Sequence, residues 1–157
     1  MVLDEEWKMD DLLNDYPVIT ELVVSWGDMD ALQHVNHTVY FHYFLNGRVS
    51  YLENLKALTS MEETGVGLIL ASIQCKFKIP LTYPDKLLVG TKVEKILKDR
   101  IFIKQILISS KHGKTAAEAD ALLVAFDYQK NHKTNLPKDL IQKIQDLEGK
   151  KSGLISE

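Results

Sequence analysis

The chain has 157 residues, of which 45% are apolar and 26% charged, as is typical of a globular protein that can bury a core. The net charge of −3 gives no basic surface for nucleic acid or an anionic membrane. Cys75 is the only cysteine, which excludes a disulfide framework and a thiolate metal cluster. The acidic start is unlike a signal peptide, and no apolar run is long enough to span a bilayer, so we expect a cytoplasmic protein.

The first third of the chain predicts a strand followed by a long helix. Residues 1–16 are acidic, and we expect a short helix there that ends at Pro17. Residues 18–26 alternate between apolar and polar side chains, which predicts a strand. A polar loop, residues 28–35, then leads into an apolar stretch from Asn36 to Leu58 that predicts a single helix.

The long helix is expected to be the centre of the fold. Its first face is formed by residues spaced three and four apart: Tyr40, Phe44, Gly47, Tyr51 and Leu55. Further apolar residues widen this face: Val39, Tyr43, Val49 and Leu52. We therefore expect burial on most sides of the helix, inside a sheet that curls around it. Asn36 is the predicted N-cap, because its side-chain oxygen can accept from the N–H of Thr38 or Val39.

The second half of the chain predicts four strands and a final helix. A polar segment, residues 59–67, is expected to be a linker in which Gly65 and Gly67 mark a break. Period-two patterns then predict strands at 68–79, 86–97, 101–110 and 115–128. A short helix is predicted at 137–147, with Pro137 in its first turn.

This order of elements predicts an α+β fold with an antiparallel, curved sheet wrapped around one long central helix. We expect one domain over residues 1–157, with a core at about 18–140 and peripheral segments at 1–16 and 148–157. An exposed edge strand in such a sheet would favour a homodimer in which two sheets join edge to edge.

The loop before the long helix is rich in polar residues that can carry chemistry: Asp28, Asp30, Gln33, His34, Asn36 and His37. These residue types also make turns and caps, so composition alone leaves a purely structural role open. Their position at a helix N-terminus adds free backbone N–H groups beside a carboxylate that is ionised at pH 7. That combination offers a base or nucleophile next to donors for a developing oxyanion.

Three motifs in this region resemble a known signature: GDMD at 27–30, HVN at 34–36 and Tyr40-Phe41. They are similar to the signature loop of the 4-hydroxybenzoyl-CoA thioesterase family of hotdog-fold proteins. The segment KFKIP at 76–80 with Asp85, and the final strand with Leu136-Pro137, resemble further parts of the family pattern. The resemblance covers about residues 18–140. It implies a hotdog fold, a homodimer or tetramer of dimers, and hydrolysis of an acyl-CoA or acyl-carrier-protein thioester without a cofactor.

The resemblance also implies roles for individual residues. Asp30 matches the catalytic carboxylate, and His37 matches the helix-start residue whose backbone N–H polarises the thioester carbonyl. His34, Asn36 and Tyr40 fall at positions expected to contact the substrate. The sequence leaves open whether Asp30 attacks the carbonyl or activates water as a general base.

The chain departs from the family pattern at two places. Gln33 replaces a glycine before the HVN motif, and Leu45 stands three residues before Arg48 where many members carry a glutamate. Lys76 and Arg100 could contact phosphates of coenzyme A, although exposed charges are more often simply solvated.

The sequence leaves three alternatives open. The protein could be a hydratase or dehydratase of the same fold that uses His34 or His37. It could also bind acyl thioesters without turning them over, because a fold does not determine a function. A metal site would need ligands from one group of neighbouring residues: Asp28, Asp30, His34, His37 and His42.

Overall fold

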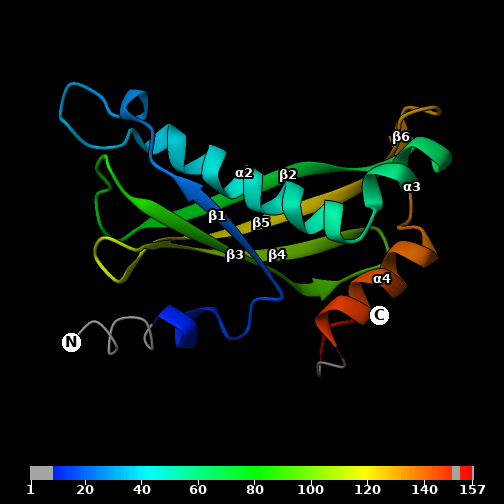
Figure 1. The fold of residues 1–157 in the computed structure, drawn as a ribbon. Helices are drawn as coiled ribbons and strands as arrows, with labels where there is room; N and C mark the ends of the chain where they lie inside the picture. Colours follow the sequence, from blue (N-terminus) through cyan, green and yellow to red (C-terminus); the bar gives the residue numbers. More distant parts are fainter. Residues whose placement is uncertain (1–8, 150–152, 157) are drawn as a thin grey trace.

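Strands with alternating apolar side chains form one antiparallel sheet in the computed structural model, which describes residues 9–149 and 153–156. The strands are β1 (Val18–Val23), β2 (Val66–Phe77), β3 (Lys86–Ile96), β4 (Arg100–Ser109) and β5 (Lys114–Asp127). Their spatial order is β1-β3-β4-β5-β2, and a two-residue strand, β6 (His132–Lys133), pairs with β5. The five predicted strands are confirmed, with ends shifted by a few residues. Figure 1 shows the sheet curving beneath the central helix.

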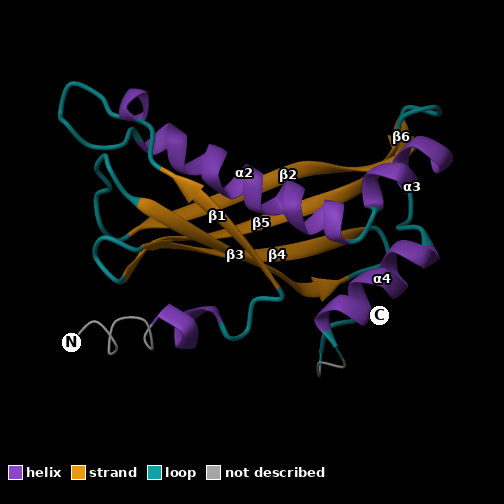
Figure 2. Cartoon of the chain, in the orientation of Figure 1, coloured by secondary structure: helices purple, strands orange, loops and turns teal. Residues whose placement is uncertain are grey.

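The central helix, α2 (His37–Asn54), lies across the sheet over β1, β3 and β4 (Figures 1 and 2). Asn36 caps it as predicted, because its Oδ1 accepts the Thr38 N–H at 2.9 Å. The helix approaches the sheet most closely at Gly47, where an added Cβ would lie 2.6 Å from Val89 Cγ1 and 2.8 Å from Thr91 Oγ1. Only glycine permits this close crossing.

The expectation of one helix to Leu58, followed by a linker, is wrong. The helix α2 ends at Asn54, and a second helix, α3 (Ala57–Thr64), follows. Lys56 separates the two helices in a left-handed conformation with φ of 54°, which no glycine signals in the sequence. The break at the end of α3 is correctly placed, because Gly65 has φ of 74° and its N–H bonds to the Met61 carbonyl.

The helix α2 is also less buried than its apolar sequence predicts. Its sheet-facing residues are buried, among them Tyr40, Phe44 and Tyr51. On the opposite flank, Leu45 is 46% exposed and Val49 is 38% exposed. One sheet covers one side of a helix, so a single chain leaves an apolar flank open.

The far end of the sheet is closed by α4 (Lys138–Glu148), which confirms the predicted final helix. Leu140 and Ile144 of α4 pack in one core cluster with Tyr51 and with Leu154 of the tail. On the outer face of the sheet, Leu13 contacts Ile106 and Ile108. The expected N-terminal helix is present at residues 9–13, while residues 1–8 lie outside the described part of the chain. None of the described helices is both long and apolar enough to cross a bilayer.

Candidate active site

The loop between β1 and α2 is held in place by Asp28. A 3-10 turn, η1 (Trp26–Asp28), brings the Asp28 carboxylate back to the Ser25 N–H at 2.9 Å. The same oxygen accepts the Tyr43 hydroxyl at 2.7 Å, which ties the loop to α2. Burial, and then the hydrogen bond to the anion, raise the pKa of Tyr43 above its ordinary value, so this phenol stays a donor. The carboxylate of Asp28 is therefore engaged in structure.

Asp30 is held more loosely, at the tip of the same loop. Its Oδ1 accepts the Leu32 N–H at 2.9 Å, while within the described part of the chain Oδ2 has only the Asn36 side-chain amide, at 3.5 Å. Backbone bonds close the turn around it: the Asp30 N–H donates to His34 O at 3.0 Å, and the Gln33 N–H donates to Asp30 O at 2.9 Å. One carboxylate oxygen is consequently available to a proton or an electrophile.

Gln33 takes the conformation that the family's glycine would supply. Its φ is 64°, in the left-handed region that disfavours side chains. The loop thus keeps a tight turn despite the substitution, at a cost of about 1–2 kcal/mol.

A cavity of about 680 Å³ opens beside Asp30. Its walls come from the loop and from the turn before β3: Trp26, Gly27, Met29, Asp30, Gln33, Thr82 and Tyr83. Trp26 is 74% exposed in the single chain. Exposed aromatic side chains beside a carboxylate suit a ligand with both flat apolar and polar parts.

The start of α2 lies directly beyond this loop. Asn36 Oδ1 accepts both the N–H and the hydroxyl of Thr38, at 2.9 and 2.7 Å. Within the described residues, the His37 N–H has no acceptor. The His37 ring contacts Phe77 of β2 edge-on, with centroids 6.5 Å apart. An unoccupied N–H at a helix N-terminus is suited to an oxyanion.

Tyr40 faces the protein rather than the loop. Its hydroxyl donates to Ile79 O at 3.1 Å, and its ring packs on Phe77 at 5.0 Å. Burial raises the pKa of Tyr40. A hollow of about 330 Å³ beside it includes His37, Phe77 and Pro80. The structure thus gives Tyr40 a role in joining α2 to the end of β2, and substrate contact by its ring stays a prediction.

The structure separates the two basic residues expected near coenzyme A. Lys76 lies one residue before Phe77, at the active-site end of β2. Arg100 begins β4 at the opposite end of the sheet, where its guanidinium bonds Asp99 at 2.9 and 3.0 Å. Within one chain Arg100 is not part of the Asp30 site, and neither phosphate contact is tested. In the described part of the chain, no three potential ligands converge as a metal site would need.

Two supporting residues were missed by sequence reasoning as parts of the site. Tyr43 was assigned to the apolar face of the helix, yet its hydroxyl anchors Asp28. Asp85 is buried before β3, where it accepts the Lys111 N–H at 2.9 Å and the Ser109 hydroxyl. A tyrosine in an apolar stripe and an aspartate in a turn give no local signal of such partners.

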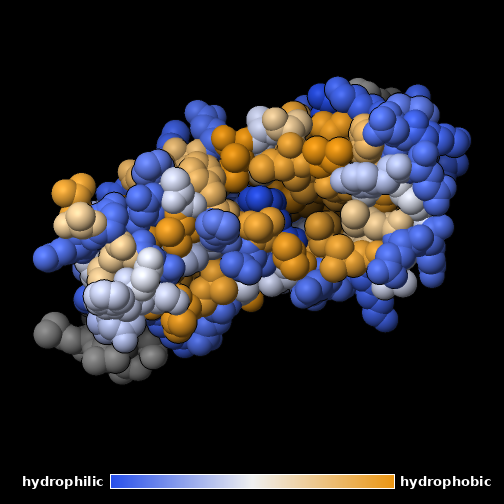
Figure 3. Space-filling model, turned by 90° about the horizontal axis from the view of Figure 1, so that it is seen from above, coloured by the Kyte–Doolittle hydropathy of each residue, from blue (hydrophilic) through white to orange (hydrophobic). Residues whose placement is uncertain are grey.

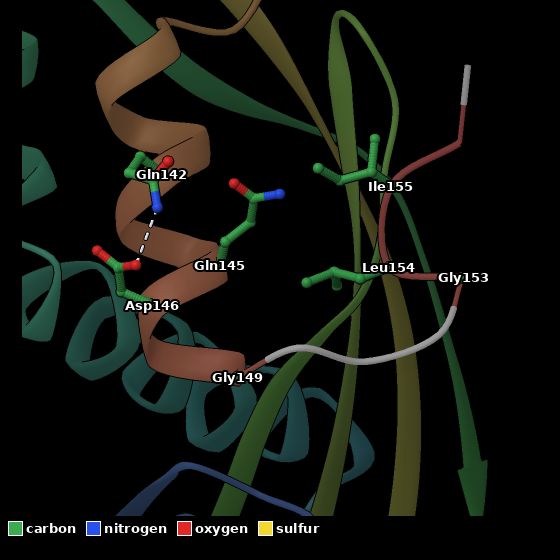
Figure 4. A pocket seen from close by; sticks show the side chains of 7 residues that line it. All are labelled: Gln142, Gln145, Asp146, Gly149, Gly153, Leu154 and Ile155. Atoms are coloured by element: carbon green, nitrogen blue, oxygen red, sulfur yellow. Dashed lines mark hydrogen bonds between the residues drawn. The ribbon is translucent and has the colours of Figure 1, made fainter.

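A further hollow, of about 380 Å³, lies between α4 and the tail (Figure 4). Gln142 and Gln145 project from α4 toward this space, while Leu154 and Ile155 form its other side. Its one acidic residue, Asp146, accepts a hydrogen bond from Gln142 at 2.9 Å. This hollow lacks the free carboxylate and helix start that the Asp30 cavity offers.

Comparison with known proteins identifies the family. The model of the thioesterase-like superfamily matches residues 24–144, more than half of the chain. The chain belongs to the thioesterase-like superfamily. The predicted hotdog fold and the predicted enzyme class, a thioester hydrolase, are confirmed at the level of the family.

Individual relatives are distant. The long-chain acyl-CoA thioesterase FadM of Escherichia coli K12 is 20% identical over 82% of this chain and 97% of its own length. A thioesterase of Thermus thermophilus, solved in complex with coenzyme A and Zn, superposes with a TM-score of 0.76 at 22% identity, over 87% and 98% of the two chains. The DHNA-CoA thioesterase of Staphylococcus aureus superposes with a TM-score of 0.73 at 24% identity, over 82% and 91%.

Proposed function

We propose that this member of the superfamily is an acyl-CoA thioesterase that uses Asp30 and the start of α2 for catalysis. The observation that carries the proposal is the contrast between the two aspartates of one loop. Among the described residues, Asp28 Oδ2 accepts two donors at 2.9 and 2.7 Å, whereas Asp30 accepts one donor at 2.9 Å on Oδ1 and one at 3.5 Å on Oδ2, beside the first turn of the helix. A loosely held carboxylate next to a free N–H is the minimal apparatus for acyl transfer from sulfur.

In the proposed reaction, the thioester carbonyl oxygen accepts the His37 N–H. Asp30 takes a proton from water while the water oxygen attacks the carbonyl carbon, and the oxyanion forms against the helix start. The C–S bond then breaks, the acid is released, and the CoA thiolate takes a proton. In the other course, an Asp30 oxygen attacks the carbonyl carbon, the C–S bond breaks, and the CoA thiolate leaves and is protonated by solvent; water then hydrolyses the mixed anhydride to the free acid and the Asp30 carboxylate. We favour the general-base course, because Asn36 holds the carboxylate without burying it.

His34 and Asn36 are proposed to help place the substrate. Asn36 links the two parts of the site, because it caps α2 and contacts Asp30. The backbone oxygen of His34 accepts the Asp30 N–H, and His34 is exposed beside the loop tip, where a ligand can reach it. The thiol ester of an acyl-carrier protein would present the same reacting atoms as that of coenzyme A.

We further propose that the working protein is a homodimer or a tetramer of dimers. β2 is an edge strand that pairs with β5 on one side only, and much of it is exposed although it is apolar. Such an edge favours pairing with a second copy. The mass of the protein in solution, measured by light scattering after gel filtration, tests this part; a monomer would contradict it.

The test of the function is a thiol-release screen over a panel of acyl-CoA substrates that differ in chain length and aromaticity. We expect stoichiometric free CoA and free acid with at least one class of acyl group. A hydratase or dehydratase would change the acyl group without releasing thiol. Binding of acyl-CoA without any turnover would identify a binding protein and contradict the proposal.

A further inference from the structure

Arg48, in the middle of α2, is a buried cation without an anion. The residue is 7% exposed, and among the described residues its only hydrogen bond runs from Nη1 to Gln105 Oε1 at 3.2 Å. Gln105 is itself fixed, because its amide nitrogen donates to Phe44 O at 2.8 Å and to Thr91 Oγ1 at 3.0 Å. No carboxylate of the described chain lies within ion-pair distance of Arg48.

Within the described residues, the remaining donors of Arg48 are unpaired but not fully sealed from solvent. A guanidinium carries five N–H groups, and Nε and Nη2 have no acceptor in the described part of the chain. Both nitrogens keep some solvent access, because neither is among the fully buried side-chain atoms without a hydrogen-bond partner. Burial lowers the pKa of Arg48, with no neighbouring anion to oppose it. A buried charge in this state is costly until an anion reaches it.

Arg48 lies on the same stripe of α2 as the proposed oxyanion donor. His37, Phe41, Leu45, Arg48 and Leu52 recur at spacings of four, four, three and four, and therefore share one side of the helix. Eleven residues separate His37 from Arg48, which corresponds to about 16 Å along the helix axis. A chain that starts at the helix N-terminus and follows this side reaches Arg48.

The space beside this stripe is apolar. Across from it on β2, Leu70, Ile73 and Phe77 pair in register with inward-facing residues of β5, so they share the helix side of the sheet. Leu45, Leu70 and Phe77 are 46%, 42% and 48% exposed. Figure 3 shows a hollow with hydrophobic walls on this side of the molecule, with hydrophilic atoms in its middle.

We propose that Arg48 binds a carboxylate at the distal end of the acyl group, so that the preferred substrates are ω-carboxyacyl thioesters. This rests on the proposed thioesterase function and specifies its substrate class. The apolar walls accommodate the methylene chain, and the two free nitrogens of Arg48 bind the terminal carboxylate. Gln105, itself bonded to Phe44 O, holds the guanidinium at Nη1 and leaves the other nitrogens for the ligand.

Arg48 would discriminate between substrates because an acyl group without a terminal carboxylate leaves its charge without a counter-ion. A plain acyl chain of equal length would leave the Arg48 charge buried without a counter-ion and two of its nitrogens unpaired, and a methyl end gains nothing there. An ω-carboxylate exchanges its hydration for charged hydrogen bonds, which are about twice as strong as neutral ones.

The test compares matched substrate pairs, from adipoyl- and hexanoyl-CoA to hexadecanedioyl- and palmitoyl-CoA, in thiol-release assays. For wild type we expect a higher kcat/KM for the ω-carboxy member at the lengths that reach Arg48. In Arg48→Met this selectivity ratio falls at least roughly tenfold, while the plain acyl-CoA is hydrolysed as well as before or better. Arg48→Lys keeps the charge but loses the planar donors, so it restores part of the ratio. Lys138→Met, which removes an exposed positive charge at the start of α4, is the control and leaves the ratio unchanged.

A binding measurement separates failure of this inference from failure of the proposed function. Calorimetry with non-hydrolysable thioether analogues of an ω-carboxyacyl-CoA and of the plain acyl-CoA of equal length needs no hydrolysis, so it remains informative if no CoA is released. Tighter binding of the ω-carboxy analogue to wild type, lost in Arg48→Met, supports the inference. Equal binding of the two analogues, or a selectivity ratio that survives in Arg48→Met, overturns it even when plain acyl-CoA is hydrolysed.

Discussion

Each end of α2 holds a tyrosine hydroxyl against a carboxylate, yet the two ends differ in whether a second carboxylate remains available. At the C-terminal end, Glu148 Oε1 accepts the Tyr51 hydroxyl at 2.7 Å and the Val93 N–H at 2.6 Å, in a fully buried setting. At the N-terminal end, Asp28 accepts Tyr43 in the same way, but the loop carries a second carboxylate, Asp30. The closed end contributes stability, and the open end keeps one acidic group free for chemistry.

Alkaline pH should weaken both ends and give the largest loss of stability. Burial, and next the carboxylates of Asp28 and Glu148, raise the pKa values of Tyr43 and Tyr51, and burial raises that of Tyr16 to about 12. Unfolded phenols ionise near pH 10, so the folded chain binds these protons more tightly. Their contribution is complete below about pH 10 and is lost above it. Urea unfolding as a function of pH measures this, and a free energy of unfolding that stays flat above pH 10 would contradict it.

Tyr51→Phe, at the closed C-terminal end of α2, should lower the stability and leave the turnover unchanged. The variant removes one donor from the buried Glu148 carboxylate, which should lower the free energy of unfolding by about 1–3 kcal/mol. Chemical denaturation measures the loss, and thiol release with acyl-CoA should be unchanged in the folded variant. A large drop in turnover would show that the two ends are coupled.

Asn36→Ala should affect both stability and turnover, because Asn36 joins the cap of α2 to Asp30. Loss of the cap should remove about 1 kcal/mol of stability. Loss of the amide beside Asp30 should lower turnover, by roughly tenfold at most. Asn36→Ser keeps a capping oxygen without the amide, so it should recover the stability and leave the turnover low. If Asn36→Ser recovers both the stability and the turnover, the whole effect of Asn36→Ala comes from loss of the helix cap.

Gln33→Gly should have the smallest effect. Glycine relieves the left-handed strain at φ of 64° but adds freedom to the unfolded chain, so the two contributions nearly cancel. We expect a Tm within a few degrees of wild type and unchanged turnover. A strong loss of turnover would show that the Gln33 side chain takes part in the reaction.

The sequence predicted much of this fold because local patterns and tertiary structure agree in its strands. Alternation over β3 and β4 placed both strands within a residue or so, and Asn36 marked the start of α2. The boundary at Lys56 was missed, because the left-handed residue there is a lysine, a residue type that does not signal a helix end. Resemblance to the family suggested Asp30, whereas the anchor at Tyr43 and the lone charge of Arg48 depend on residues far apart in sequence.

The turnover of Asp30→Asn tests the central claim most directly. The substitution keeps the shape of the side chain but removes the anion, and the Asp139→Asn variant on α4 is its control. Measured by thiol release with the best acyl-CoA of the panel, turnover should fall at least about a hundredfold in Asp30→Asn, with an unchanged Tm. Turnover within a few-fold of wild type, with short-chain and aromatic substrates alike, would contradict the account.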